Sequence, residues 1–212
     1  MVAQFSSDSG CVISSLRTVS LSLPPGLYKC CDEAEQLEFC EYVIPTQSRR
    51  WPPLSTTFHV LALEPNIHCV KYLQESASAA SHVQLLDIID GSIEDISAEV
   101  KDGSIDAVVG TYVLCSVNNT EAALNEIKRV LKPNGKYYFV EHVRDDYYNS
   151  WTHISQRLMH PIMKFFAGCD CAKNTWTFIE RAGFKELNYH RMTVPNGYAL
   201  FLRPHIYGYA AK

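Results

Sequence analysis

The stretch from Asp102 to Val143 constrains the fold of this chain more than any other. It begins D-G-S-I-D-A-V-V-G-T-Y-V-L-C-S-V-N-N and ends E-I-K-R-V-L-K-P-N-G-K-Y-Y-F-V-E-H-V. An acidic turn leads into an apolar strand, a capped helix follows, and a Lys-Pro-Asn-Gly turn opens a second strand. This order is typical of one half of a doubly wound α/β sheet, which binds nucleotide-like cofactors at the carboxyl edge of its strands. The glycine-rich loop that usually accompanies such a half is not visible near the start of the domain.

Length and composition set the broad class. The chain has 212 residues, of which 47% are hydrophobic, and these values predict one ordinary domain with a substantial core. Its formal charge of −4 argues against a nucleic-acid surface, because phosphate binding requires a basic face. No apolar run approaches the length of a membrane span, and the N-terminus lacks the basic and apolar regions of an export signal. We therefore expect a soluble, cytoplasmic protein as written.

The eight cysteines are many for this length. The close pairs are Cys30-Cys31 and Cys169-x-Cys171, and neither has the C-x-x-C spacing of zinc or redox sites. The eight histidines are scattered along the chain. We therefore expect free thiols, several of them packed as small hydrophobic side chains, and no metal site.

The first quarter of the chain differs from the rest. Residues 1–57 are rich in Ser, Cys and Pro, and they end in a basic patch flanked by proline, Arg49-Arg50-Trp51-Pro52-Pro53. Within them, Thr18 to Leu23 alternates with period two, like a half-buried strand. We expect residues 1–57 to be a divergent segment, poorly ordered or inserted, and residues 58–212 to form the folded domain.

The remainder of the chain alternates strands and helices. A buried strand is predicted at Phe58–Leu63, a short strand at Val83–Asp87, a strand covered on both faces at Ile105–Thr111, and a fourth strand at Lys136–Val143. Helices are predicted at Asn66–Ser76, Ile93–Val100, 119–130, Trp151–Phe166 and Asn174–Ala182.

Two features are expected to bound the helix that ends at Val130. Asn118, with Glu121 three residues on, is the predicted cap at its start. Gly135 is expected to supply the positive φ that the exit from this helix requires.

The C-terminal part completes the fold prediction. Phe184 to Met192 and Tyr198 to Tyr207 read as two strands around Pro195-Asn196-Gly197, which is a hairpin signal. We predict an α/β, Rossmann-like, mostly parallel sheet with a C-terminal antiparallel hairpin, its first strand and glycine loop missing or replaced. That is the usual plan of class I methyltransferases.

Glu64 is the sharpest candidate for a ligand-binding residue. It ends the strand Phe58–Leu63 and is followed by Pro65 and Asn66. A carboxylate in this position can accept hydrogen bonds from both ribose hydroxyls of a nucleotide. The alternative is an acidic residue that merely stabilises the start of the next helix through the macrodipole.

The turn Asp90-Gly91-Ser92-Ile93 follows the next strand, where a methyltransferase loop holds adenine. Gly91 permits a close backbone approach, Ser92 can form hydrogen bonds, and Ile93 can face the ring. A plain turn with a helix cap explains the same residues equally well.

Further candidates lie where the third and fourth strands end, at the edge where open α/β sheets place ligands. Cys115 is either a nucleophile, a thiol that lines the substrate site, or a buried neutral thiol, which we favour because no nearby base would lower its pKa. His142, after Glu141, is either a general base or a structural histidine. The apolar residues of Trp151–Phe166 are expected to form core or a pocket lid.

These residues resemble the methyltransferase-like protein 7 family, S-adenosylmethionine-dependent enzymes that methylate alkyl thiols. The resemblance runs from about Phe58 to Lys212. Its motifs are A-L-E-P-N, D-G-S-I-D, V-L-C-S-V, R-V-L-K-P-N-G, V-E-H-V and R-P-H-I-Y-G-Y-A. The third, fifth and last of these motifs are the most specific.

The resemblance implies a set of roles around bound S-adenosylmethionine. Glu64, with Pro65 and Asn66, would bind the ribose, and Gly91, Ser92 and Ile93 would line the adenine. Thr111, Tyr112 and Leu114 would lie beside the methionine portion. Cys115, Glu141 and His142 would border a small-molecule thiol, and methyl transfer to sulfur would need a positioned thiolate.

The sequence also departs from the family. The hydrophobic N-terminal segment that anchors the family to the endoplasmic reticulum or lipid droplets is not seen, and a longer form carrying it would reach those membranes. Only Ser9-Gly10 and Pro24-Pro25-Gly26 hint at the family's G-x-G-x-G-like loop. Residues 27–56 stand where the family passes almost directly into its second strand. We interpret them as an insertion from a retained or mis-spliced coding piece, and the N-terminus as incomplete.

Two other functions fit part of the sequence. A catalytically impaired methyltransferase-like scaffold would explain the loss of the cofactor glycine loop. An NAD-dependent oxidoreductase would also use Glu64, but the absence of G-x-G-x-x-G and the C-terminal hairpin disfavour it.

Overall fold

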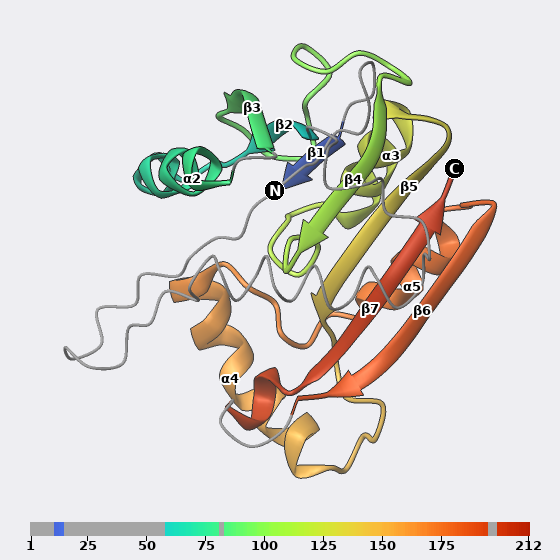
Figure 1. The fold of residues 1–212 in the computed structure, drawn as a ribbon. Helices are drawn as coiled ribbons and strands as arrows, with labels where there is room; N and C mark the ends of the chain where they lie inside the picture. Colours follow the sequence, from blue (N-terminus) through green and yellow to red (C-terminus); the bar gives the residue numbers. More distant parts are fainter. Residues whose placement is uncertain (1–10, 15–57, 81–82, 195–198) are drawn as a thin grey trace.

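The computed structural model describes residues 11–14, 58–80, 83–194 and 199–212 (Figure 1). Two sheets and their covering helices make up these residues. The elements are β1 (Cys11–Ser14), β2 (Phe58–Leu63), α2 (Ile67–Ala79), β3 (Val83–Ile89), β4 (Ile105–Thr111), α3 (Thr120–Val130), β5 (Leu131–His142), α4 (Trp151–Ala167), α5 (Thr175–Arg181), β6 (Glu186–Thr193), the 3₁₀ helix η1 (Leu200–Leu202) and β7 (Pro204–Ala211).

The strand order confirms the predicted α/β fold. The larger sheet has the order β1-β4-β5-β7-β6, and β2 pairs with β3 in a smaller one. The pairs β1–β4, β4–β5 and β2–β3 are parallel, whereas β5–β7 and β6–β7 are antiparallel. The described residues therefore form a parallel sheet edged by a C-terminal antiparallel hairpin. The Asn-Gly turn predicted for that hairpin lies outside the described residues.

A short N-terminal strand takes the place that the sequence leaves open. β1 pairs with β4 from Cys11 opposite Ala107 to Ser14 opposite Gly110, and it lies beside β2 on its other side (Figure 1). The first strand is therefore replaced by Cys11–Ser14 and is not missing. Thr18–Leu23, whose alternation is typical of a half-buried strand, lies outside the described residues, as do both glycine-loop hints and residues 27–56.

The core forms where β4 and β5 are covered by helices. Ile105, Ala107 and Val108 of β4 are buried, as expected for a strand covered on both faces. α3 packs against them with a helical stripe of buried residues, Ala123, Leu124, Ile127 and Val130.

Two details at the ends of α3 differ from prediction. The cap is Asn119, whose side chain accepts from the backbone N–H of Ala122, and the predicted cap Asn118 is exposed and lies one residue too early. After the helix, Asn134 and not Gly135 has the positive φ, 66°. Gly135 is needed for space instead, because a Cβ there would lie 2.9 Å from the carbonyl oxygen of Lys132.

The helix predicted at Ile93–Val100 is wrong. Residues 91–100 form turns in which Ile93, Ile96 and Val100 are nevertheless buried in the core. Their spacing imitates a helix face, but the hydroxyl of Ser92 accepts from the backbone N–H of Glu94 at 3.5 Å. Such local bonds compete with the helical hydrogen-bond ladder, so the segment stays in single turns.

α4 is confirmed as a helix, but its apolar side is not core. The exposed apolar side chains are Trp151, Ile154, Leu158, Ile162, Phe165 and Phe166. The buried residues of this helix are polar, His153 and Gln156, and they face the rest of the domain. No helix among the described residues has the length and apolar character needed to cross a membrane.

The β6–β7 hairpin depends on one close approach between backbones. A Cβ on Gly208 would lie 2.2 Å from the carbonyl oxygen of Asn188 and 2.6 Å from the Cα of Tyr189. Both contacts are with backbone atoms of the neighbouring strand, so a side chain can enter only if the strands separate. Only glycine fits at this point of the sheet.

We predict that Gly208→Ala lowers the free energy of unfolding by roughly 2–4 kcal/mol, because overpacking against backbone forces the ladder apart. Urea unfolding monitored by circular dichroism measures the change. Gly91→Ala is the matched control, since its Cβ would meet only Ile89, at 3.9 Å, and should cost under about 0.5 kcal/mol. Equal stability of the two variants would contradict the close-packing argument.

Candidate functional site

The buried carboxyl group of Glu141 holds the loop after β4 by its backbone N–H groups. Oε1 of Glu141, at the end of β5, accepts hydrogen bonds from the backbone N–H of Val113 at 3.0 Å and of Leu114 at 2.9 Å. Oε2 accepts from the N–H of Cys115 at 3.3 Å. Burial raises the pKa of Glu141 to about 8, although the three N–H donors act in the opposite direction. One side chain thus satisfies three donors of a non-helical loop inside the protein.

A lysine holds the same loop by its carbonyl groups. Nζ of Lys173, from the segment between α4 and α5, donates to the carbonyl oxygens of Leu114 at 2.8 Å and Val117 at 3.1 Å. It also donates to the hydroxyl of Thr120 at 2.9 Å, at the start of α3. Burial lowers the pKa of Lys173. The loop at 113–117 is therefore fixed on its N–H side by a carboxyl group and on its C=O side by an amine.

Tyr112 turns the chain sharply out of β4. Its φ of 56° lies in the left-handed region that bulky residues seldom adopt, at a cost on the order of 1 kcal/mol. Its ring stacks on His142 with centroids 4.2 Å apart and 14° between planes. His205, in β7, meets both rings edge-on, at 5.4 Å and 4.8 Å. One ring just after β4 and one ring each from β5 and β7 thus form one wall beside the loop.

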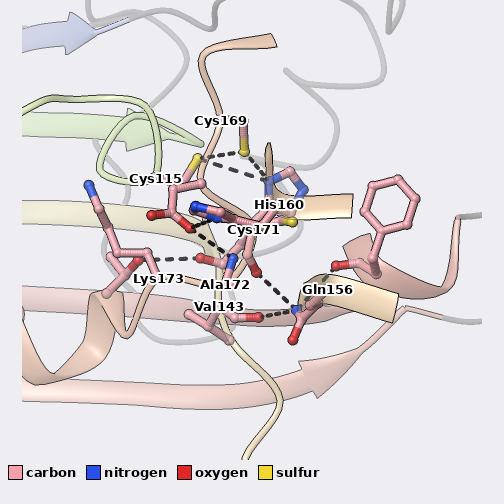
Figure 2. A network of polar contacts seen from close by, with 12 residues as sticks. Cys115, Val143, Gln156, His160, Cys169, Cys171, Ala172 and Lys173 are labelled. Atoms are coloured by element: carbon pink, nitrogen blue, oxygen red, sulfur yellow. Dashed lines mark hydrogen bonds and ion pairs between the residues drawn. The ribbon is translucent and has the colours of Figure 1, made fainter. Parts of the chain in front are cut away.

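Two thiols and an imidazole meet next to this wall, and Figure 2 shows the two thiols, those of Cys115 and Cys169, facing each other. Sγ of Cys115 lies 3.4 Å from Sγ of Cys169, and Nδ1 of His142 lies 4.0 Å and 3.7 Å from these sulfur atoms. The hydrogen bond with Cys169 and burial raise the pKa of Cys115 well above its usual value. Burial, aided by His205, lowers the pKa of His142 to about 3. The imidazole is therefore neutral and a weak base, which disfavours a general-base role for His142.

One amide anchors the segment that carries Cys169. Nε2 of Gln156 donates to the carbonyl oxygens of Val143 at 2.9 Å, Cys171 at 3.0 Å and Phe201 at 3.1 Å (Figure 2). Its Oε1 accepts from the N–H of Asp145 at 2.9 Å. Gln156 is buried at 1% exposure, so these bonds are shielded from water. They connect α4, the end of β5, the approach to α5, and η1.

His205 adds a polar atom to the wall. Nδ1 of its ring lies 3.0 Å from the carbonyl oxygen of Arg203, which makes this nitrogen the donor, and Nε2 is a buried acceptor without a partner in the described part of the chain. A buried acceptor without a partner costs roughly 1–3 kcal/mol. Nε2 of His205 can therefore accept a hydrogen bond from a ligand bound beside the wall.

The residues predicted to bind ribose lie at a separate cleft. Glu64 is buried at the end of β2, and its Oε1 accepts from the N–H of Asn66, while Pro65 is exposed. Together with Asp90, Glu64 borders a cleft of about 450 Å³ between α2 and β3. The cleft also includes apolar side chains of both elements, among them Ile67, Val70 and Leu85. A carboxylate and an apolar wall are thus present together.

The other predicted residues divide between the two places. Gly91 follows Asp90, and a Cβ there would make an ordinary contact with Ile89 at 3.9 Å, whereas Ser92 is exposed and Ile93 belongs to the core. Thr111 is half-buried at the end of β4, and Leu114 is fully buried. The structure therefore gathers Tyr112, Cys115, Glu141 and His142, and sets Glu64 apart with Asp90.

Sequence reasoning missed four residues of this site: Cys169, Lys173, Gln156 and His205. Cys169 lies 54 positions from Cys115, and Lys173 lies 59 positions from Leu114. No local spacing links such residues, so only the tertiary fold reveals them. The scattering of the cysteines and histidines along the sequence, taken as evidence against a cluster, did not exclude one in space.

The comparisons with known proteins define first the class of protein. Residues 48–139 match the family described as Methyltransferase domain. A SAM-dependent methyltransferase from Methanosarcina mazei superposes with a TM-score of 0.53 over 73% of this chain and 82% of its own, at 17% identity. The N-methyltransferase NodS from Bradyrhizobium japonicum, in complex with S-adenosyl-l-homocysteine, superposes with a TM-score of 0.50 over 73% of this chain and 66% of its own, at 13% identity. The fold is that of class I methyltransferases.

The sequence relatives are more specific. Thiol S-methyltransferase TMT1A of Homo sapiens is 38% identical over 154 residues, which are 72% of this chain and 62% of the relative. The chain belongs to the class I S-adenosylmethionine-dependent methyltransferases, as a homologue of the thiol S-methyltransferases. It spans about three fifths of the length of the curated relatives it matches.

We predict that Glu141→Ala destabilises the protein by roughly 2–4 kcal/mol, because three buried N–H groups lose their acceptor together. Chemical unfolding measures the loss. Glu121→Ala, an exposed carboxylate in the first turn of α3, is the control and should change stability by less than about 0.5 kcal/mol. If the two variants unfolded at the same denaturant concentration, Glu141 would not hold the loop.

Proposed function

We propose that this chain is an S-adenosylmethionine-dependent methyltransferase that methylates the sulfur of small alkyl thiols. The observation that carries the proposal is the wall of Tyr112, His142 and His205 beside two thiols, at the carboxyl ends of β4 and β5. Open α/β sheets bind their ligands at this edge. Aromatic rings and uncharged thiol groups form polarizable surroundings, which suit the sulfur of a thiol substrate better than they would suit a charged acceptor.

The residues of the cleft near Glu64 fit the adenosine half of the cofactor. The buried Glu64 stands where ribose hydroxyls can donate to its carboxylate, and apolar side chains of α2 and β3 offer a surface for the purine. Gly91 leaves room for a close approach of the ligand to the backbone. When bound, S-adenosylmethionine supplies an electrophilic methyl group on a sulfonium.

The remaining task of the chain is to position the thiol. The clamp formed by Glu141 and Lys173 fixes the loop at 113–117, so Tyr112 and Cys115 keep their places without rearranging around each substrate. Displacement at a methyl group depends on the alignment of the attacking atom. Side chains that contact the substrate and are held rigidly, as Tyr112 and Cys115 are, supply that alignment. Buried surroundings also exclude water, which would solvate a thiolate and reduce its reactivity.

We predict that Glu64→Gln weakens the binding of S-adenosylhomocysteine at least tenfold, because a charged acceptor for the ribose hydroxyls is lost. Isothermal titration calorimetry measures the change. Glu75→Gln is the control, since Glu75 is an exposed residue of α2 that pairs with Lys71 across one turn. Unchanged affinity in Glu64→Gln, with normal unfolding, would exclude the ribose contact.

The activity itself is tested with S-adenosylmethionine carrying a labelled methyl group and a small alkyl thiol. We expect the labelled methyl thioether by mass spectrometry, and no methyl ether from the alcohol of the same chain length. An alcohol methylated as fast as the thiol would contradict sulfur specificity. No detectable binding of S-adenosylhomocysteine at high concentration would favour the catalytically impaired scaffold.

A further inference from the structure

Sγ of Cys115, Sγ of Cys169 and Nδ1 of His142 form a nearly equilateral triangle. Its edges are 3.4 Å, 3.7 Å and 4.0 Å, and the atoms all lie within 4.8 Å of one another. A tetrahedral zinc ion with Zn–S of about 2.3 Å and Zn–N of about 2.0 Å holds its ligand atoms roughly 3.5–3.8 Å apart. A point about 2.2 Å from all three atoms lies in their plane, so an ion fits with little movement of the side chains.

The chemistry of the cluster matches the same ion. Two thiols and one imidazole are soft and borderline ligands, the set that zinc and related thiophilic ions prefer over hard cations. The ring of His142 is held in place by stacking on Tyr112, and Cys115 and Cys169 are buried at 1% and 7% exposure. The two sulfur atoms are thus shielded from solvent, while the half-buried His142 lies on the more open side of the cluster.

The protein also fixes the three ligands before any ion arrives. Cys115 lies in the loop that Glu141 and Lys173 hold, and the N–H of Asp170, next to Cys169, donates to the carbonyl oxygen of Cys115 at 2.9 Å. Asp170 itself accepts from the ring of His160 at 2.9 Å (Figure 2). Metal sites owe much of their affinity to such supporting bonds around the ligands.

We propose that Cys115, His142 and Cys169 bind a zinc ion with three protein ligands and one open coordination position. Cys115 and Cys169 release their protons as their sulfur atoms bind the ion, and His142 binds through Nδ1. Closed structural sites take four protein ligands, whereas three are typical of sites that hold an exchangeable molecule. In the described residues, the cluster contains three ligand groups and no fourth.

The open position would take the thiol substrate, and this step rests on the proposed function. The thiol sulfur binds the ion and its proton passes to solvent, so a metal thiolate forms with no change of oxidation state. Zinc lowers the pKa of a bound thiol enough to deprotonate it outright. The site would thus provide the thiolate that methyl transfer needs and that the buried surroundings alone disfavour.

Cobalt(II) is the probe for the ion, because its absorption reports ligand type and geometry and zinc displaces it. We expect titration of the reduced, full chain to give sulfur-to-cobalt charge-transfer bands and the visible bands of a tetrahedral ion. Cys115→Ala and Cys169→Ala should weaken cobalt binding at least about a hundredfold or abolish these bands.

The control variants test whether other cysteines bind the ion. Cys69→Ala changes a half-buried thiol of α2, and Cys171→Ala changes a buried thiol two residues from Cys169. Both should keep the wild-type spectrum. The absence of tetrahedral bands in the wild type, or bands unchanged in the Cys115→Ala, Cys169→Ala double variant, would overturn the metal site. A disulfide between Cys115 and Cys169 in the protein purified under reducing conditions would do so as well.

A second measurement separates this inference from the proposed function. A small alkyl thiol added to the cobalt-loaded chain should shift the visible bands, and the matching alcohol should not. Cobalt bands without any binding of S-adenosylhomocysteine would leave the metal site standing and defeat the methyltransferase. Methylation at an unchanged rate after complete removal of metal by a chelator would defeat thiol recruitment by the ion while leaving the methyltransferase intact.

Discussion

The loop after β4 is an irregular piece of backbone buried inside the protein, and its burial is possible only because its polar groups are paired. Glu141 accepts from three successive N–H groups, and Lys173 donates to two carbonyl oxygens and one hydroxyl. Neither side chain would be buried at low cost alone, because an isolated charge in the interior is unfavourable. Each is retained because the loop between them satisfies both. The ring wall and the thiol cluster depend on the position of this loop.

The strain at Tyr112 follows from the same constraint. The chain must leave β4, place Cys115 against Cys169, and still present three N–H groups to Glu141 within three residues. A left-handed φ at Tyr112 achieves this reversal, and the stacking of its ring on His142 offsets part of the cost. Strain that is compensated by contacts on the ligand-facing side is expected where a site needs fixed geometry. The backbone and the side chains therefore specify one arrangement.

The sequence predicted the strands better than the site. β2 and β4 were predicted with the bounds that the structure has, because their apolar runs are bounded by Glu64-Pro65 and by turns. The apolar residues of α4 predicted the helix but not the side that it buries. The buried hydrogen bonds of Gln156 to three carbonyl groups turn the polar side of α4 inward and leave its apolar side exposed. Asn119 and Asn134 each lie beside the residue that was predicted, a shift of one position that patterns do not resolve. Cys169 and Lys173 needed the fold itself, because their partners are more than fifty residues away.

The two candidate regions are supported by different elements, and this division has a physical consequence. The cleft at Glu64 depends on α2 and β3, whereas the thiol cluster depends on β4, β5 and the segment before α5. The carboxylate of Glu64 accepts from the N–H of Asn66, and its own N–H donates to the carbonyl oxygen of Ile89 in β3, while β1 lies between β2 and β4. Sites that lie far apart on different elements usually contribute additively to the free energy of unfolding. A substitution at the cleft near Glu64 is therefore expected to leave the thiol side in place, with the loop held by Glu141 and Lys173, the three rings and the two cysteines.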